Sequence, residues 1–232
     1  MFFVILLALF NDSIVDTIGS VDDLIEKYEE INLSIKNFRK TFFKRFYDNL
    51  PIEREQDLSK IIYLESGSQP PKSEHIYEYK QGYIRFIQNR DYSNESHKTY
   101  IKISNKNKVC SVSDILIDKY GEAGTIRYGL TGAYNVALAK VIPKNTNMLE
   151  FLRDFLSQKS ISEILYQSSQ ASTRPSLNES SLTGIKIKIP VGKDLNEYEQ
   201  TMSKFLSQEL IICNKISTLR NTKQLLLQKY FG

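Results

Sequence analysis

The chain has 232 residues, of which 41% are hydrophobic, including 12 Phe and 14 Tyr, so it can bury a core and is not a wholly disordered protein. Its formal net charge of +4 permits a polyanionic partner without requiring one. Cys110, Cys213, His75 and His97 stand alone, without metal-ligand spacing. We therefore expect neither a disulfide framework nor a metal site.

An unbroken apolar run extends from Phe2 to Phe10. The run is too short to cross a membrane, which takes about 20 residues. It also lacks the basic start and the small-residue cleavage site of a signal peptide. We expect a buried strand or the apolar start of a helix here, and a cytoplasmic protein with no membrane partner.

A seven-residue apolar repeat follows this run and predicts a long helix that packs along its length. The first position of the repeat holds Ile14, Val21, Tyr28, Ile35 and Phe42. The second position holds Leu24, Ile31 and Phe38. Asn11, Asp12 and Ser13 can cap a first turn, and Pro51 stops the helix. We therefore expect a helix from just after Ser13 to about Asn49.

The same stripe returns near the other end at a constant offset of 184 residues. Its first position holds Tyr198, Phe205, Ile212, Leu219 and Leu226, and its second position holds Met202, Ile216 and Tyr230. Glu209 and Lys223 interrupt the second position and could fix the register of a helix pair. Asp194 and Glu197 have the spacing of a capping box after Gly192, which predicts a helix start at Asp194.

Short β-branched or aromatic segments lie between the two helices and predict strands. The predicted strands are 61–64, 83–87, 100–103, 114–117, 135–141 and 185–189. One helix is predicted from Met148 to about Tyr166. We expect an α+β fold: a mixed α/β globule over 51–190, flanked by helical regions over 1–50 and 191–232 that pack as an antiparallel coiled coil.

Three polar stretches of the globule could contact a nucleic acid. In 88–94, amide and guanidinium side chains could pair with base edges, although such residues are also common in ordinary loops. In 119–135, glycines alternate with basic and tyrosine residues that could hold phosphates and sugars, or simply form the tight turns of a β-hairpin. The serine-rich stretch 167–184 is equally consistent with a functional or a flexible loop.

Enzyme motifs are missing from the sequence. There is no Asn-Pro-Pro-aromatic tetrad for methyl transfer and no glycine-rich turn that would place a cofactor at a helix N-terminus. Carboxylates near a lysine, such as Glu78 and Lys80, are scattered and are typical of a solvated face. We expect a non-catalytic chain with no catalytic residue and no cofactor.

The central block resembles the target-recognition domain of type I restriction–modification specificity subunits. Asp114–Gly121 and Gly132–Val141 carry most of the resemblance. Gly82–Ile87 is similar to the opening motif of that domain, and Gln170–Ser176 with Leu182–Pro190 is similar to its closing motif. The two heptad helices are similar to the spacer regions of the family.

The resemblance implies a DNA-recognition subunit whose globule reads one half of a split site in double-stranded DNA. In this family, the helices act as a measuring rod and dock modification (methyltransferase) subunits, which bind S-adenosylmethionine, and a separate motor–nuclease subunit cuts. Full members carry two recognition domains, whereas this chain carries one, so it resembles a half-subunit or a truncated product. A half-subunit would also pair two copies through the helices about a two-fold axis.

Polarity and loop position select the residues that we expect to contact DNA. Base contacts are expected from Gln88, Asn89, Arg90, Tyr92, Arg127, Tyr128, Asn135 and Thr173. Backbone contacts are expected from Lys98, Lys119 and Arg174, and Tyr120 is expected to contact DNA beside Lys119. Three alternatives remain open: a helical scaffold whose globule binds protein or sugar, a stand-alone restriction or methyltransferase enzyme, and a decayed remnant that binds nothing.

Overall fold

A computed structural model describes residues 2–93, 97–144, 147–170 and 175–231, with the side chains of the first helix described from Val15 on. The chain divides into two compact units. One holds residues up to Thr41 together with those from Lys204 on, and the other is the globule from Phe42 to Ser203. None of the described helices is long and apolar enough to cross a membrane.

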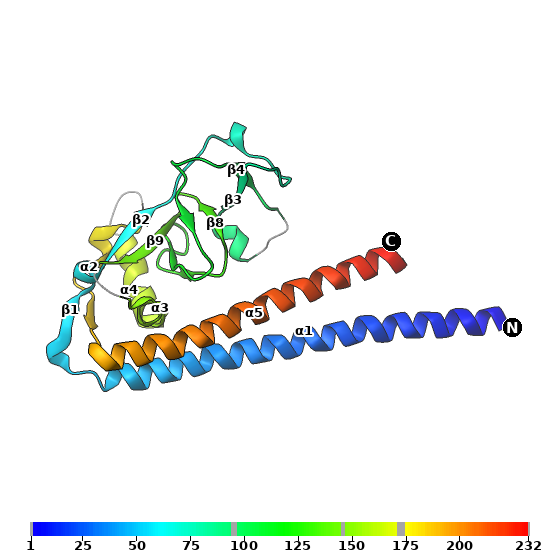
Figure 1. The fold of residues 1–232 in the computed structure, drawn as a ribbon, viewed down its shortest axis with the longest axis horizontal. Coiled ribbons are helices and arrows are strands. Elements are labelled where there is room, and N and C mark those ends of the chain that lie inside the picture. Colours follow the sequence, from blue (N-terminus) through cyan, green and yellow to red (C-terminus); the bar gives the residue numbers. More distant parts are fainter. Residues whose placement is uncertain (1, 94–96, 145–146, 171–174, 232) are drawn as a thin grey trace. The chain divides into compact units, whose positions relative to one another are not determined.

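The first unit consists of the outer parts of two long helices, α1 (Phe2–Asp48) and α5 (Gly192–Phe231), which run side by side (Figure 1). Cross-helix contacts show that they are antiparallel. Lys36 lies 3.5 Å from the Glu209 carboxylate, and Asp22, further toward the N-terminus, binds Lys223 at 2.6 Å. The flanking antiparallel helix pair expected from the sequence is confirmed.

The first position of the apolar repeat is also confirmed in α1, because Val21, Tyr28 and Ile35 are partly buried. The assignment of the second position was wrong for Leu24 and Ile31, which are 45% and 40% exposed. Phe38 is 45% exposed, but its ring packs against Phe205 of α5 with centroids 4.7 Å apart, so it does contact the partner helix. The second position instead lies four residues after the first, and it is occupied by Ile25, Asn32 and Arg39.

The physical reason for this shift is that steps of three and four residues lie on nearly the same helix face. Apolar content favoured the step of three, but the helix pair buries polar side chains at the step of four. Glu209 is only 2% exposed and Arg39 only 4%. The Asn32 amide lies 3.7 Å from the Cys213 sulfur. A buried polar layer of this kind restricts a helix pair to one register.

Both helices begin earlier than predicted. α1 begins at Phe2 rather than after Ser13, so the apolar run is the start of a helix and not a strand. The sequence from Phe2 to Ile18 contains no Gly or Pro that would interrupt a helix. The polar residues Asn11, Asp12 and Ser13 are tolerated inside the helix, so they do not mark its start. α5 begins at Gly192, which places Asp194 inside the first turn, where its charge favours the free amides.

The globule contains three sheets. In the first four-stranded sheet, β2 (Ile62–Ser66), β9 (Leu138–Pro143), β6 (Leu116–Asp118) and β7 (Ile126–Arg127) are adjacent in this order. In the second, the order is β4 (Tyr100–Lys102), β3 (Tyr83–Ile87), β8 (Gly132–Tyr134) and β5 (Val109–Cys110). A two-stranded sheet pairs β1 (Glu55–Asp57) with β10 (Lys186–Lys188). Only the β3–β8 pair of the described strands is parallel.

Short helices complete the globule. The α-helices are α2 (Leu58–Ile61), α3 (Leu149–Leu156) and α4 (Lys159–Ser169). The 3₁₀-helices are η1 (Ile52–Arg54), η2 (Lys72–Glu74), η3 (Asn89–Tyr92) and η4 (Glu179–Leu182). The single helix predicted over 148–166 is therefore two helices separated at Ser157 and Gln158.

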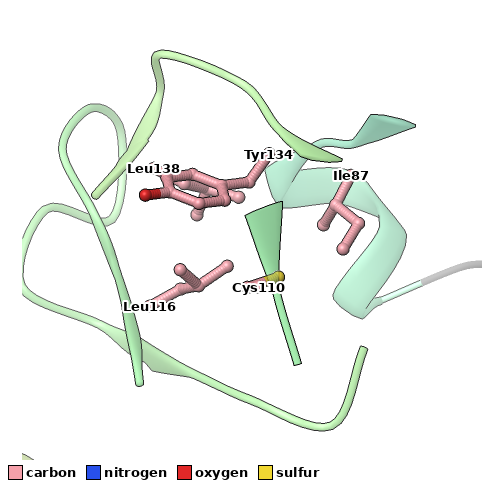
Figure 2. Close-up of a cluster of buried hydrophobic side chains, with 5 residues drawn as sticks. All are labelled: Ile87, Cys110, Leu116, Tyr134 and Leu138. Atoms are coloured by element: carbon pink, nitrogen blue, oxygen red, sulfur yellow. The ribbon is translucent and has the colours of Figure 1, made fainter. Parts of the chain in front are cut away.

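The core of the globule joins the two four-stranded sheets. Figure 2 shows Ile87, Cys110, Leu116, Tyr134 and Leu138 converging, and each is at most 5% exposed. Leu116 and Leu138 come from the first sheet, and the other three come from the second. The Tyr134 hydroxyl also donates to the Glu65 carboxylate at 3.0 Å, which satisfies its polar end. Burial raises the pKa of the Cys110 thiol to about 11, so it behaves as an inert core residue.

The first turns of α5 are anchored to the globule through α3. The Glu199 carboxylate accepts hydrogen bonds from the backbone amides of Glu150 and Phe151 at 3.0 and 2.8 Å. Glu199 thus caps α3, whose own N-cap residue makes no side-chain hydrogen bond. The Tyr198 ring packs edge-on against Phe151, and its hydroxyl donates to Asp154 at 2.7 Å. Burial raises the pKa of Glu199.

The predicted strands exist but several are displaced. The strand over 83–87 is confirmed as β3, and the strand predicted over 114–117 is β6, which begins two residues later. The strand predicted over 135–141 was wrong at its start, because Asn135 forms only an isolated bridge with Ser68 and a turn at residues 136–137 separates it from β9. Four strands of two or three residues, β1, β5, β7 and β8, were not predicted.

Candidate nucleic-acid interface

The first predicted stretch forms a rigid turn, η3, directly after β3. Its geometry is fixed by Asp91, whose carboxylate accepts the backbone amide of Gln88 at 2.9 Å. Asp91 is 3% exposed, whereas the side chain of Arg90 is 58% exposed and lies 3.8 Å from the Asp91 carboxylate. The side-chain amide of Gln88 donates to the Thr99 hydroxyl at 3.3 Å, so one of its donor hydrogens is already used within the protein. This turn holds the Arg90 guanidinium outward on a well-fixed backbone.

The second predicted stretch contains the β6–β7 hairpin, in which Leu116 pairs with Arg127. Arg127 donates through Nε and Nη2 to one oxygen of Asp118, at 3.1 and 2.8 Å, and through Nη2 to Glu122 at 2.6 Å. Asp118 is fully buried, and this burial raises its pKa, while the Arg127 guanidinium acts in the opposite direction. Arg127 thus neutralises a buried carboxylate and is only 19% exposed.

The structure brings the η3 turn and the hairpin together. The Arg127 guanidinium lies 5.8 Å from the centroid of the Tyr92 ring. A hydrogen bond from Asn89 also acts to lower the pKa of Asp118. Four predicted contact residues, Asn89, Arg90, Tyr92 and Arg127, therefore belong to one neighbourhood, of which Arg90 is the most exposed cation.

Two other predicted contact residues, Tyr128 and Asn135, make contacts within the protein that stabilise the fold. Tyr128 lies under the buried Arg153, whose guanidinium is 4.5 Å from the ring centroid. The Asn135 side chain accepts the backbone amide of Ala137 at 3.2 Å and so closes a turn. A Cβ on Gly67 would lie 2.1 Å from the Asn135 carbonyl oxygen, so this close approach requires glycine.

The predicted backbone-contact residues are more exposed. The Lys119 ammonium donates to the Ser66 hydroxyl at 2.9 Å and lies 5.9 Å from the ring of Tyr120, which is 45% exposed. Lys98 lies on the surface just before β4. Thr173 and Arg174 lie outside the described residues.

A concentration of positive charge was overlooked in the sequence. The segment from Lys72 to Lys108 has eight Lys and Arg against four Asp and Glu, so its net charge equals that of the whole chain. This segment builds β3, β4 and the turns beside them. Charge summed over a sliding segment, rather than over the whole globule, would have located it.

A shallow depression beside the hairpin is lined by Glu122, Thr125, Glu163 and Tyr166, among others. Both of its carboxylates are paired with cations. Glu122 accepts a hydrogen bond from Arg127 at 2.6 Å, and Glu163 lies 3.7 Å from the Lys159 ammonium. The depression therefore differs from the β3–β4 side of the globule, where the segment 72–108 has a net positive charge.

The sequence of the chain matches the family described as type I restriction modification DNA specificity domain over residues 54–226. The protein therefore belongs to this family of specificity domains. No curated protein matches the chain.

Three solved structures share the fold. The S subunit of a type I restriction–modification system from M. genitalium gives a TM-score of 0.68 at 17% identity, covering 95% of this chain and 60% of that one. The HsdS subunit from Thermoanaerobacter tengcongensis gives 0.52 at 17% identity, with 95% and 56% covered. A structure described by complex assembly and conformational transition of the type I R-M system gives 0.51 at 15% identity, with 95% and 57% covered. The chain spans less than two thirds of each.

Proposed function

We propose that this chain is a non-catalytic specificity subunit of a type I restriction–modification complex, which reads one half of a two-part site in double-stranded DNA. The observation that carries the proposal is the family match over 54–226, which includes both four-stranded sheets. The exposed Arg90 on the fixed η3 turn and the positive charge of 72–108 support it, because base reading and phosphate binding require such groups.

In this proposal the helices dock the modification subunits, and through them the motor–nuclease subunit, in the cytoplasm. The proposal is tested by mapping methylated bases in cells that contain this chain and its modification subunits. A methylated two-part sequence is expected, and it should disappear when the chain is deleted. Unchanged methylation after the deletion would contradict the proposal.

We further propose that two copies pair through an apolar stripe on α1, centred on Leu24 and Ile31. These side chains are one repeat of seven residues apart and remain 45% and 40% exposed beside the α5 helix. Phe38, at the next position of the repeat, packs against Phe205 of α5 within the chain. The repeat matches that of a further packed helix. A second copy fits because it would supply the same stripe in a self-complementary, two-fold arrangement, and because the chain spans only about three fifths of the solved S subunits.

Light scattering of the purified chain, alone and with its modification subunits, tests this pairing. Leu24→Ser combined with Ile31→Ser should convert a dimer into a monomer without unfolding the globule. Val15→Ser, at an exposed position outside the stripe, serves as the control. A monomer in both preparations of the unaltered chain would eliminate the dimer.

A further inference from the structure

Two neighbouring tyrosines, Tyr77 and Tyr79, are the most exposed aromatic side chains among the described residues, at 71% and 73%. Neither helps to fill the core. The Tyr79 ring meets Tyr100 of β4 edge-on at 5.9 Å, and this contact positions it on the outer surface. Exposed aromatic rings of this size are an unusual use of residues that folding would otherwise bury.

The backbone around these tyrosines is fixed on both sides. Before them, Ile76 forms a two-way hydrogen-bonded bridge with Tyr100, at 3.0 and 2.8 Å. After them, the Tyr83 amide donates to the Lys80 carbonyl oxygen at 3.1 Å, closing a turn in which Gly82 has a φ of +84°. A residue with a side chain would be strained at Gly82. The rings are therefore presented on a defined surface.

Two lysines lie near this segment in the sequence or in the adjoining sheet. Lys80 follows Tyr79 directly, and its ammonium lies 5.8 Å from the Tyr83 ring. Lys102 pairs with Tyr83 across the β3–β4 ladder and is exposed. Alternation along β4 places Lys102 on the same face as Tyr100, while Ile101 points into the core.

We propose that Tyr77, Tyr79, Lys80 and Lys102 form a second DNA-contacting surface, which holds the sugar–phosphate backbone of duplex DNA beside the sequence that is read. The inference rests on the proposed function and names a part of the globule that would contact the DNA backbone. The lysines bind phosphates, and the tyrosines pack against sugars and donate to phosphate oxygens. This surface contributes affinity that does not depend on sequence.

The pairing of the strands places this surface on the same sheet as the η3 turn. Ile76 bridges Tyr100 of β4, and Tyr100 pairs with Arg85 of β3. Thr99, the residue before Tyr100, accepts a hydrogen bond from Gln88, which directly precedes η3. The tyrosine segment and η3 therefore flank the same part of β4, where one duplex could contact both.

Tyrosine-rich surfaces also bind proteins, and charge decides between the two partners here. The segment around the rings carries twice as many cationic as anionic residues. Lysine is depleted at the centre of protein interfaces, whereas it is favoured against phosphates. We therefore commit to duplex DNA.

The test measures fluorescence anisotropy of a labelled random-sequence duplex of about 30 base pairs with the full chain, alone and copurified with its modification subunits. Tyr77→Ala combined with Tyr79→Ala should weaken binding about fivefold or more, because the duplex loses two hydroxyl donors to its phosphates together with the packing of the rings on its sugars. Tyr63→Ala is the matched control, since Tyr63 is 40% exposed on β2 of the other sheet and should change nothing. Thermal unfolding of each variant checks its fold.

A second measurement does not depend on the tyrosine variants. Lys80→Ala combined with Lys102→Ala should reduce the slope of log affinity against log salt by about two, because each phosphate contact contributes about 0.9. Glu78→Gln removes an exposed carboxylate from between the tyrosines and should strengthen binding.

Three results would overturn the inference. Salt-dependent DNA binding that neither double variant alters would reject the surface and leave the proposed function intact. Loss of the modification subunits from the tyrosine variant, with DNA affinity unchanged, would assign the surface to a protein. A complete lack of salt-dependent DNA binding by the unaltered chain in both preparations would reject the surface and the proposed function together.

Discussion

The η3 turn and the β6–β7 hairpin each place an arginine beside a buried aspartate, and the two arginines end in opposite situations. In η3, Asp91 accepts a backbone amide, and Arg90 remains 58% exposed. In the hairpin, Asp118 accepts two hydrogen bonds from Arg127, which is 19% exposed. The Arg90 guanidinium is therefore exposed because the Asp91 carboxylate accepts a backbone amide, whereas the Arg127 guanidinium is held by two hydrogen bonds to Asp118.

Replacing each arginine by alanine tests this comparison most strongly. Arg127→Ala leaves the Asp118 carboxylate buried without a cation, and we expect the free energy of unfolding to fall by about 3 kcal/mol. Arg90→Ala should change it by less than about 0.5 kcal/mol, because the side chain is exposed. Urea denaturation measures both. A similar small loss for the two variants would show that Arg127 does not hold the hairpin together.

DNA titration sharpens the same comparison from the functional side. Once methylation mapping supplies the site, Arg90→Ala should cost about 1–3 kcal/mol on that duplex and little on random DNA. Lys119→Ala should weaken both by a similar factor, because phosphate contacts carry no sequence information. Equal losses on both duplexes for Arg90→Ala would refute its role as a base reader.

The support beneath Arg90 can be removed separately. Asp91→Ala deletes the acceptor for the Gln88 amide, and we expect a loss of about 1 kcal/mol in stability. The preference for the site duplex over random DNA that Arg90 contributes should fall at the same time, because the backbone of Arg90 is no longer fixed. Asp91→Asn retains an acceptor oxygen and is the control. Full discrimination in Asp91→Ala would mean that the turn is held by other contacts.

A third pair, Glu65 and Lys108, extends the comparison to a more exposed site. Its ammonium and carboxylate are 2.8 Å apart, and the hydrogen bond from Lys108 lowers the pKa of Glu65. The stabilisation is therefore present above the unfolded-state pKa of about 4.3 and is lost as pH falls through the lower folded-state value.

Lys108→Met should cost less than about 0.5 kcal/mol at pH 7, because exposed pairs are weak. The difference from the unaltered chain should shrink below about pH 4, as Glu65 takes up its proton. Denaturation at several pH values measures this. A difference that grows toward acid pH would contradict the assigned role of the pair.

Long elements were predictable because their signals extend over many residues. The two helices follow from a repeat sustained over several heptads, and β3 follows from a β-rich run between Gly82 and the polar Gln88. Strands of two residues, such as β5 and β7, are too short to show an alternation of polar and apolar residues. They are strands only because they form hydrogen bonds with a neighbouring strand, which the local sequence does not reveal. The break between α3 and α4 likewise carries no Gly or Pro.

The candidate site was predictable only in its location. Polarity after β3 indicated η3, but the partners of Arg127 become neighbours only when the hairpin pairs. The choice of seam in α1 depended on burial of Asn32 and Arg39, which apolar content cannot reveal. All of the assigned base and backbone contacts stay predictions.

The Glu199 cap determines where the globule can be transplanted. A graft limited to 51–190 would leave behind the carboxylate that closes the first turn of α3, as well as Phe43 and Tyr198, which are 2% exposed against Phe151. Exchange of recognition modules between related proteins should therefore succeed when the crossover points lie within the helices, near residues 42 and 203, and fail when they fall at the edge of the sheets.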